Sequence, residues 1–146
     1  MTAELEVKQA EGIELKERLM AEVERAVAEQ EPYAIVAGVP QLLPGEEISE
    51  VIQVAAKCAR DLVREGDIVG LLDGEIIAVG LSGTTPNLAR VFAYRLQSDL
   101  RLRTHALRNT VWETAFACLP QDGESSEDLL RNAIERAVTR RRRLGA

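Results

Sequence analysis

The segment REGDIVGLLDGEIIAVGL, residues 64–81, decides the fold of this chain. Gly66 has the position and type of a residue that ends a helix, and the apolar run at 67–72 predicts a strand that begins directly after it. Asp73-Gly74 suits a type I′ turn, and a second apolar run at 75–81 follows at once. The segment therefore predicts a helix end followed by an antiparallel hairpin.

Local signals on both sides of this hairpin predict the remaining elements. Pro32 and Pro40 bound a short apolar run at 33–39, which reads as a buried strand, and a further apolar strand is expected at 111–119. Thr85-Pro86 provides a helix cap and a first-turn proline. Apolar residues at helical spacing predict four helices, at about 4–30, 48–62, 85–96 and 125–137.

The resulting order contains a β-α-β-β-α-β core, so the predicted fold class is α+β. We expect a ferredoxin-like antiparallel sheet with helices packed on one face and an acidic N-terminal helix in addition. Each helix should bury one apolar side, and the residues expected to point inward are Leu15, Leu19, Val23, Ala26, Val27, Ile48, Val51, Ile52, Ala55, Ala59, Leu62, Leu88, Val91, Phe92, Leu96, Leu129, Ala133, Ile134 and Ala137.

Length and composition fit one compact domain, residues 1–146, with 46% hydrophobic residues and a net charge of −6. The chain shows no apolar run of membrane-spanning length and no signal region, so we expect a cytoplasmic protein without membrane insertion. Its acidic balance argues against nucleic acid as a partner. The one basic block, Arg140 to Arg143, is either a contact for an anionic partner or a solvated helix end.

Four stretches of the chain resemble the GGDEF domain of diguanylate cyclases, which act in bacterial signalling. Arg64 and Asp67 form its R-x-x-D, and Asp73, Gly74, Glu75, Ile76 and Ile77 stand where the family has GGDEF. Residues 93–96 are similar to its A-E-R-[IL] helix, and residues 119–130 to its P-x-D-G and S-x-E-x-L-L. The resemblance covers roughly residues 14–140 and implies a nucleotide-cyclase-like fold, in agreement with the predicted order of elements.

Departures from the family's pattern imply a degenerate domain. The family has a carboxylate at the end of the first strand, where this chain has Gly38-Val39-Pro40. The family also has two adjacent acids in its signature, but here Glu75 is followed by Ile76, so the acidic pair is broken. Divalent metal needs such oxygen ligands. The family's guanine-reading helix is missing between strand and helix near residues 41–44. We therefore expect no catalytic residue, no bound metal, no cofactor and no diguanylate cyclase activity.

A second site implied by the resemblance keeps its residues. In active cyclases R-x-x-D binds the product cyclic di-GMP away from the catalytic cleft, and Arg64, Asp67 and Arg95 fall at the matching positions. A guanidinium can grip guanine O6 and N7, and a carboxylate can accept from N1 and N2. The alternative is that Arg64 and Asp67 serve only to cap a helix end and a strand start.

Three functions remain open at this stage. The chain is a regulatory or protein-interaction module, a residual nucleotide-processing enzyme that uses Glu75 with Glu46 or Glu47, or a structural domain that oligomerises through its acidic N-terminal helix. Partners are expected to be other proteins or a second copy, with cyclic di-GMP as a possible ligand. Other residues predict little chemistry: Cys58 and Cys118 read as reduced core residues, His105 as solvated, and Trp112 as either core or contact residue.

Overall fold

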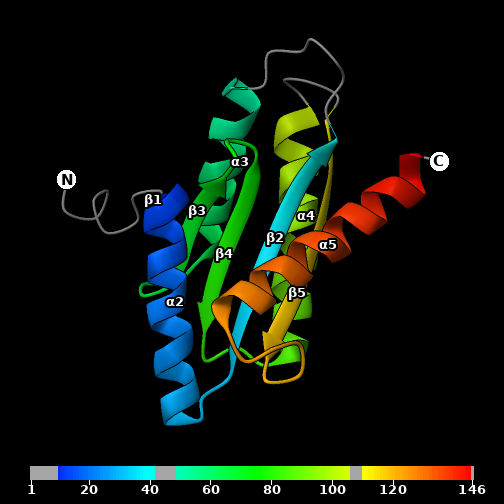
Figure 1. Cartoon of the computed structure of the whole chain (residues 1–146). Helices are drawn as coiled ribbons and strands as arrows, with labels where there is room; N and C mark the ends of the chain where they lie inside the picture. The colour runs from blue at the N-terminus through cyan, green and yellow to red at the C-terminus, as the bar shows by residue number, and fades with distance from the viewer. Residues whose placement is uncertain (1–9, 42–48, 106–109, 146) are drawn as a thin grey trace.

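The computed structural model describes residues 10–41, 49–105 and 110–145 (Figure 1). Within them the helices and core strands follow the predicted order, with a short added strand β1. The N-terminal helix begins at Gly12 and not near residue 4, because β1 precedes it. The elements are β1 (Ala10–Glu11), α2 (Gly12–Glu29), β2 (Tyr33–Gln41), α3 (Ser49–Leu62), β3 (Ile68–Leu72), β4 (Ile76–Ser82), α4 (Pro86–His105), β5 (Val111–Leu119) and α5 (Ser126–Gly145).

The five strands form one sheet in the order β1-β3-β4-β2-β5. β2 pairs antiparallel with both β4 and β5, and β3 pairs antiparallel with β4. The two residues of β1 pair parallel to β3 at one edge. The core strands therefore have the ferredoxin-like arrangement, and the predicted α+β fold is confirmed.

The two helices of the β-α-β-β-α-β core, α3 and α4, lie on one face of the sheet as predicted, and α2 and α5 cover the opposite face (Figure 1). Side chains alternate along a strand: Ala34 and Val36 of β2 pack in the cluster that holds α3 and α4, while Ile35 and Ala37 pack in the cluster that holds α2 and α5. The first eight residues of β2 are all buried. A strand that is buried on both sides requires a covering layer on both sides.

The β3–β4 hairpin confirms the predicted turn. Asp73 and Gly74 have positive φ values of 53° and 75°, as a type I′ turn requires. The amide of Glu75 donates a hydrogen bond to the carbonyl of Leu72 at 3.2 Å. Because Leu72 pairs with Ile76, Glu75 belongs to the turn and not to the second strand, where the sequence placed it.

The buried side of α4 differs from the predicted one. Leu88 and Val91 are exposed, Phe92 is only partly buried, and Val27 of α2 is also exposed. Within the described residues, no helix combines the length and the apolar composition that a membrane crossing needs. The side of α4 that faces the sheet consists of Ala89, Ala93, Leu96, Leu100 and Thr104.

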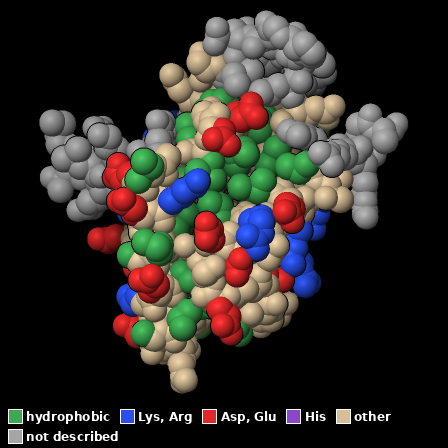
Figure 2. Space-filling model, in the orientation of Figure 1, with side chains coloured by type: hydrophobic (Ala, Val, Ile, Leu, Met, Phe, Trp, Pro, Cys, Tyr) green, Lys and Arg blue, Asp and Glu red, His purple; other side chains and the backbone are tan. Residues whose placement is uncertain are grey.

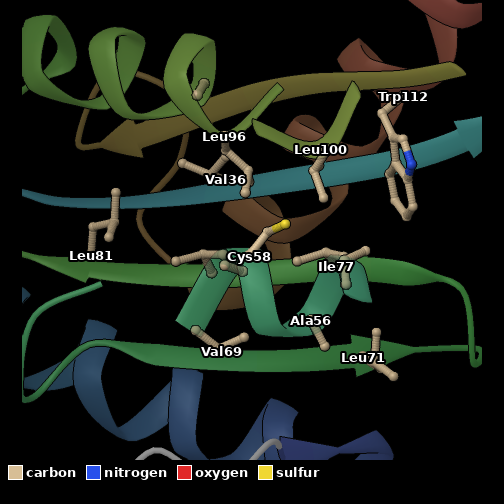
Figure 3. Close-up of a cluster of buried hydrophobic side chains, with 14 of the residues drawn as sticks. Val36, Ala56, Cys58, Val69, Leu71, Ile77, Leu81, Leu96, Leu100 and Trp112 are labelled. Atoms are coloured by element: carbon tan, nitrogen blue, oxygen red, sulfur yellow. The ribbon is translucent and has the colours of Figure 1, made fainter. Parts of the chain in front are cut away.

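Trp112 is a core residue, which settles the alternative that the sequence left open. Its side chain is fully buried at one end of the cluster that also holds Leu96 and Leu100 (Figure 3). The indole Nε1 donates a hydrogen bond to Thr104 Oγ1 at 3.1 Å, and this hydroxyl donates to the carbonyl of Leu100 at 2.6 Å. Trp112 therefore ties β5 to the last turn of α4.

The edge strand β5 has its outward polar groups capped by side chains. The amide of Thr114 donates to Gln97 Oε1 at 2.8 Å, and its carbonyl accepts from Arg140 at 2.7 Å. Arg136 donates to the carbonyl of Phe116 at 2.8 Å. The amide of Cys118 donates to the Asp122 carboxylate at 2.8 Å. Arg140, which the sequence placed in a basic block of unknown role, is thus bound to the sheet edge.

Candidate functional site

The first candidate region is the end of β2 next to the β3–β4 turn, where the sequence resemblance implies a nucleotide cleft. Gly38 pairs with Ile77 of β4 on one side and with Thr114 of β5 on the other. A Cβ added at Gly38 would contact carbon atoms of Ile77, Leu100 and Thr114 at 3.6–3.8 Å. The backbone at Gly38 therefore lies against apolar groups and not against carboxylates.

The five signature positions divide into a turn and a packed strand. Asp73 and Gly74 are exposed in the turn, and Glu75 is partly buried. Ile76 packs against the clusters on the α2 and α5 face, while Ile77 is fully buried on the α3 and α4 face. The described residues contain no group of three or more carboxylate, imidazole or thiol side chains that could hold a metal ion. The isoleucines therefore contribute to packing.

The second candidate region is the R-x-x-D segment, which the structure brings together with the loop between β4 and α4. Asp67 accepts hydrogen bonds from the amide of Arg64 at 2.9 Å and from the amide of Ser82 at 3.3 Å. Arg64 Nη2 donates to the Ser82 carbonyl at 2.7 Å and reaches Thr84 Oγ1 at 3.4 Å. We call this set of four residues the Arg64 clasp.

The two charged members of the Arg64 clasp differ sharply in exposure. The Asp67 side chain is 2% exposed and the Arg64 side chain is 66% exposed, with Nε and Oδ2 3.5 Å apart. Both carboxylate oxygens of Asp67 already accept from backbone amides. Asp67 therefore holds the α3–β3 turn against the end of β4, while Arg64 presents its guanidinium to solvent.

Arg95 lies outside the Arg64 clasp. It is exposed in the middle of α4, nine residues after Pro86, which is roughly 14 Å along the helix at 1.5 Å per residue. The structure therefore joins Arg64 and Asp67 directly and places Arg95 further along the neighbouring helix. Ser82 and Thr84 were missed by sequence reasoning, because no local pattern says that the loop after β4 meets the end of α3.

Two ion pairs link α4 to its neighbours and were also missed. Arg101 donates to the buried carboxylate of Glu113 in β5 at 2.9 Å. Arg103 donates to Asp61 of α3 at 3.1 Å, and this hydrogen bond holds the pKa of the Asp61 carboxyl below its usual range. The first pair links α4 to the sheet, and the second links it to α3.

The remaining candidates from the sequence supply no site. Cys58 and Cys118 are buried free thiols, and burial raises the pKa of the Cys118 thiol to about 11 and also raises that of Cys58. Both therefore stay protonated at neutral pH, as core residues do. His105 is exposed at the end of α4. Glu46 and Glu47, the acids of the residual-enzyme alternative, lie outside the described residues.

A surface hollow beside α5 has a volume of about 360 Å³ and is lined by Asn132, Glu135, Arg136, Thr139 and Arg140. Its two arginines already donate to carbonyls of β5. The hollow lies on α5, whereas Arg64 contacts the loop between β4 and α4. It is therefore separate from the Arg64 clasp.

No protein-family model and no curated protein matches this sequence. Solved structures match the fold. A DGC protein from Thermotoga maritima has a TM-score of 0.76 and 18% identity over 90% of this chain and 96% of that chain. The GGDEF domain of DgcB from Caulobacter crescentus in complex with c-di-GMP has a TM-score of 0.75 and 14% identity over 93% of this chain and 85% of that chain.

Diguanylate cyclase SiaD from Pseudomonas aeruginosa, in complex with its activator SiaC, has a TM-score of 0.78 and 20% identity; the match covers 99% of this chain and 62% of that chain. Together these similarities show that the chain has the fold of a GGDEF domain. Fold alone leaves the chemistry to the residues of the site.

Proposed function

We propose that this chain is a single, degenerate GGDEF-like domain that works by binding other proteins and does not join GTP molecules. The observation that carries the proposal is the apolar packing at the signature: Gly38 of β2 lies against Ile77 and Leu100, and Ile77 is fully buried. Catalysis by a GGDEF domain, as the sequence resemblance implies it, depends on Mg²⁺ held by carboxylates at this place. Packing has replaced those ligands, so the surface of the domain carries its function.

A complex of a GGDEF-fold protein with another protein supports this proposal. SiaD, which shares the fold over 99% of this chain, is in complex with its activator SiaC. A protein that contains this fold can therefore have a protein partner. In the present chain the exposed apolar side chains of α4 provide the surface for such contacts.

Purified protein incubated with GTP and Mg²⁺ or Mn²⁺ is expected to form no cyclic di-GMP. The physical reason is the loss of metal ligands, since phosphoryl transfer without bound metal loses most of its electrostatic stabilisation. Chromatography of the nucleotides after overnight incubation checks this. Product that appears with the wild type and disappears with Glu75→Ala would instead support the residual-enzyme alternative.

We propose a second, compatible function at the Arg64 clasp: binding of cyclic di-GMP. The favouring observation is that Arg64 is two-thirds exposed while its guanidinium is already positioned by the Ser82 carbonyl at 2.7 Å. A positioned guanidinium can donate to guanine O6 and N7 with little loss of side-chain freedom. Arg95 would take the second guanine further along α4, and Asp67 would act by holding the clasp.

Calorimetric titration with cyclic di-GMP is expected to show micromolar binding, and Arg64→Ala should weaken it more than tenfold. A bidentate guanine contact contributes about 1–3 kcal/mol, and its loss leaves a guanine edge unpaired. Arg131→Ala on α5 is the matched control, because it removes an arginine that is 57% exposed, against 66% for Arg64, on the other face of the sheet. Absence of wild-type binding at high micromolar ligand would remove this second function and leave the first.

A further inference from the structure

The outer side of α4 exposes a row of large apolar residues, which we call the α4 ridge: Leu88, Val91, Tyr94 and Leu102, with Arg95 between them. The four apolar side chains are 57–78% exposed. They recur at intervals of three to eight residues, so they lie along the side of the helix opposite to the buried alanines. Large apolar residues gathered on one exposed face mark an interaction surface.

The outer side of α2 carries a second row, which we call the α2 ridge: Ile13, Met20 and Val27, with Glu17 and Glu24 between them. The apolar members are spaced by seven residues and are 47–77% exposed. Glu17 and Glu24 are also exposed. Figure 2 shows hydrophobic side chains interspersed with Asp and Glu down the side of the molecule that α2 forms.

The two ridges match in length and are opposite in charge. Ile13 and Val27 are fourteen positions apart, as are Leu88 and Leu102, which is roughly 21 Å of helix. α2 carries five glutamates and three basic residues, and α4 carries four arginines and one aspartate. Because Arg101 and Arg103 already pair with acids of β5 and α3, Arg95 supplies the positive charge on the α4 ridge. Opposite potentials on surfaces of equal length favour their association.

Pairing of like ridges is less favourable. An antiparallel pair of α4 ridges centred on Arg95 would place this arginine against the same arginine of the second copy. Two α2 ridges would bring together two helices that are both acidic overall. Charge therefore selects the α2 ridge of one copy for the α4 ridge of another.

The positions of the two helices make this contact intermolecular. α2 packs on one face of the sheet with Ile35, and α4 packs on the opposite face with Val36 (Figure 1). One copy cannot bring its own ridges together, and both of its ridges remain available at the same time. A contact between unlike surfaces of this kind is heterologous and repeats from copy to copy.

We infer that a second copy of this chain docks its α2 ridge on the α4 ridge, so that the protein assembles head to tail. The inference rests on the proposed function, in which the domain acts through protein contacts, and it names the surface and the partner. The ridge apolar residues pack between the helices, and Glu17 and Glu24 face Arg95. Assembly grows with concentration, because each added copy leaves one ridge of each kind free.

Two charge-reversal variants test the inference by sedimentation velocity over a range of concentrations. Arg95→Glu removes the charge match of the α4 ridge, and the double variant Glu17→Arg/Glu24→Arg removes that of the α2 ridge. We expect wild-type protein to associate progressively and each variant to associate at least tenfold more weakly. A one-to-one mixture of the two variants should associate again, since one intact ridge of each kind remains and the two reversed ridges are also opposite in charge.

Matched controls are Arg131→Glu and Glu124→Arg, which reverse exposed charges outside both ridges and should associate as the wild type does. Because the substituted ridge residues are exposed, circular dichroism should show all variants folded. A monomeric wild type at all concentrations, unchanged association of the single-ridge variants, or a mixture that stays monomeric would each overturn the inference. Sedimentation and the GTP assay measure different properties. A protein that does not self-associate would overturn this inference, and whether it forms cyclic di-GMP from GTP would still be decided by the GTP assay.

Discussion

Replacement of Trp112 by alanine is expected to lower the free energy of unfolding by about 3–5 kcal/mol, the usual range for a large aromatic residue in a core. The indole is fully buried and bonded to Thr104, so the variant would lose packing in the α4 cluster and the hydrogen bond between β5 and α4. Urea denaturation followed by far-ultraviolet circular dichroism measures the effect, since Trp112 is the only tryptophan in the sequence.

Two controls separate burial from the hydrogen bond in this experiment. Val111→Ala alters the neighbouring, exposed residue of the same strand and should change stability by less than about 0.5 kcal/mol. Trp112→Phe keeps most of the volume but loses the donor to Thr104, and should fall between the wild type and the alanine variant. A Trp112→Ala protein as stable as the Val111→Ala protein would contradict the core position of the indole.

Replacement of Asp67 by alanine is expected to destabilise the fold by about 2–4 kcal/mol. The side chain is 2% exposed, and it accepts from the amides of Arg64 and Ser82. Removal leaves both amides without this acceptor, and hydrogen bonds to charged groups contribute about 1.5–3 kcal/mol each. Equilibrium urea unfolding of wild type and variant measures the difference.

Glu65→Ala is the matched control, because Glu65 is an exposed carboxylate in the same turn and should be nearly neutral. Equal stability of the Asp67 and Glu65 variants would show that the Arg64 clasp does not hold the turn. Loss of stability only with Asp67→Ala would indicate that Asp67 holds the folded turn. Any weaker ligand binding by this variant would then follow from the loss of that structure.

The hairpin and the order of elements were predictable because their signals are local. Asp73-Gly74 specifies its turn through the φ values it adopts, and β5 has the predicted limits of 111–119. The sequence also indicates that both faces of the sheet are covered. The residues of β2 are apolar at successive positions, whereas a strand with one solvent-exposed face is apolar only at alternate positions. Two-sided burial could have been read from that run.

The orientation of α4 was harder to predict because two sets of residues recur at helical spacing. Leu88 and Val91 suggested one buried side, but Ala89 and Ala93 form the side that contacts the sheet. Small side chains allow a helix to approach its neighbour closely, and a pattern search for large apolar residues overlooks them. The exposed leucine and valine then become part of the α4 ridge.

The Arg64 clasp could be predicted only in part. R-x-x-D was visible in the sequence, and a capping role for Asp67 was one of two alternatives considered. Its partners Ser82 and Thr84 lie fifteen or more residues later and approach only when the hairpin has formed. Contacts set by tertiary structure leave no fixed spacing in a sequence, so the burial of Asp67 could not be foreseen.

The capped edge of β5 determines how this protein can aggregate. An unpaired strand edge can template the addition of foreign strands and ultimately cross-β fibrils. Arg136 and Arg140 occupy the carbonyls that an incoming strand would need, and Asp122 accepts from the amide of Cys118. Arg136 and Arg140 belong to α5, and Arg136 also donates to Asp122, so detachment of this helix, short of global unfolding, would open this edge of the sheet to the addition of foreign strands.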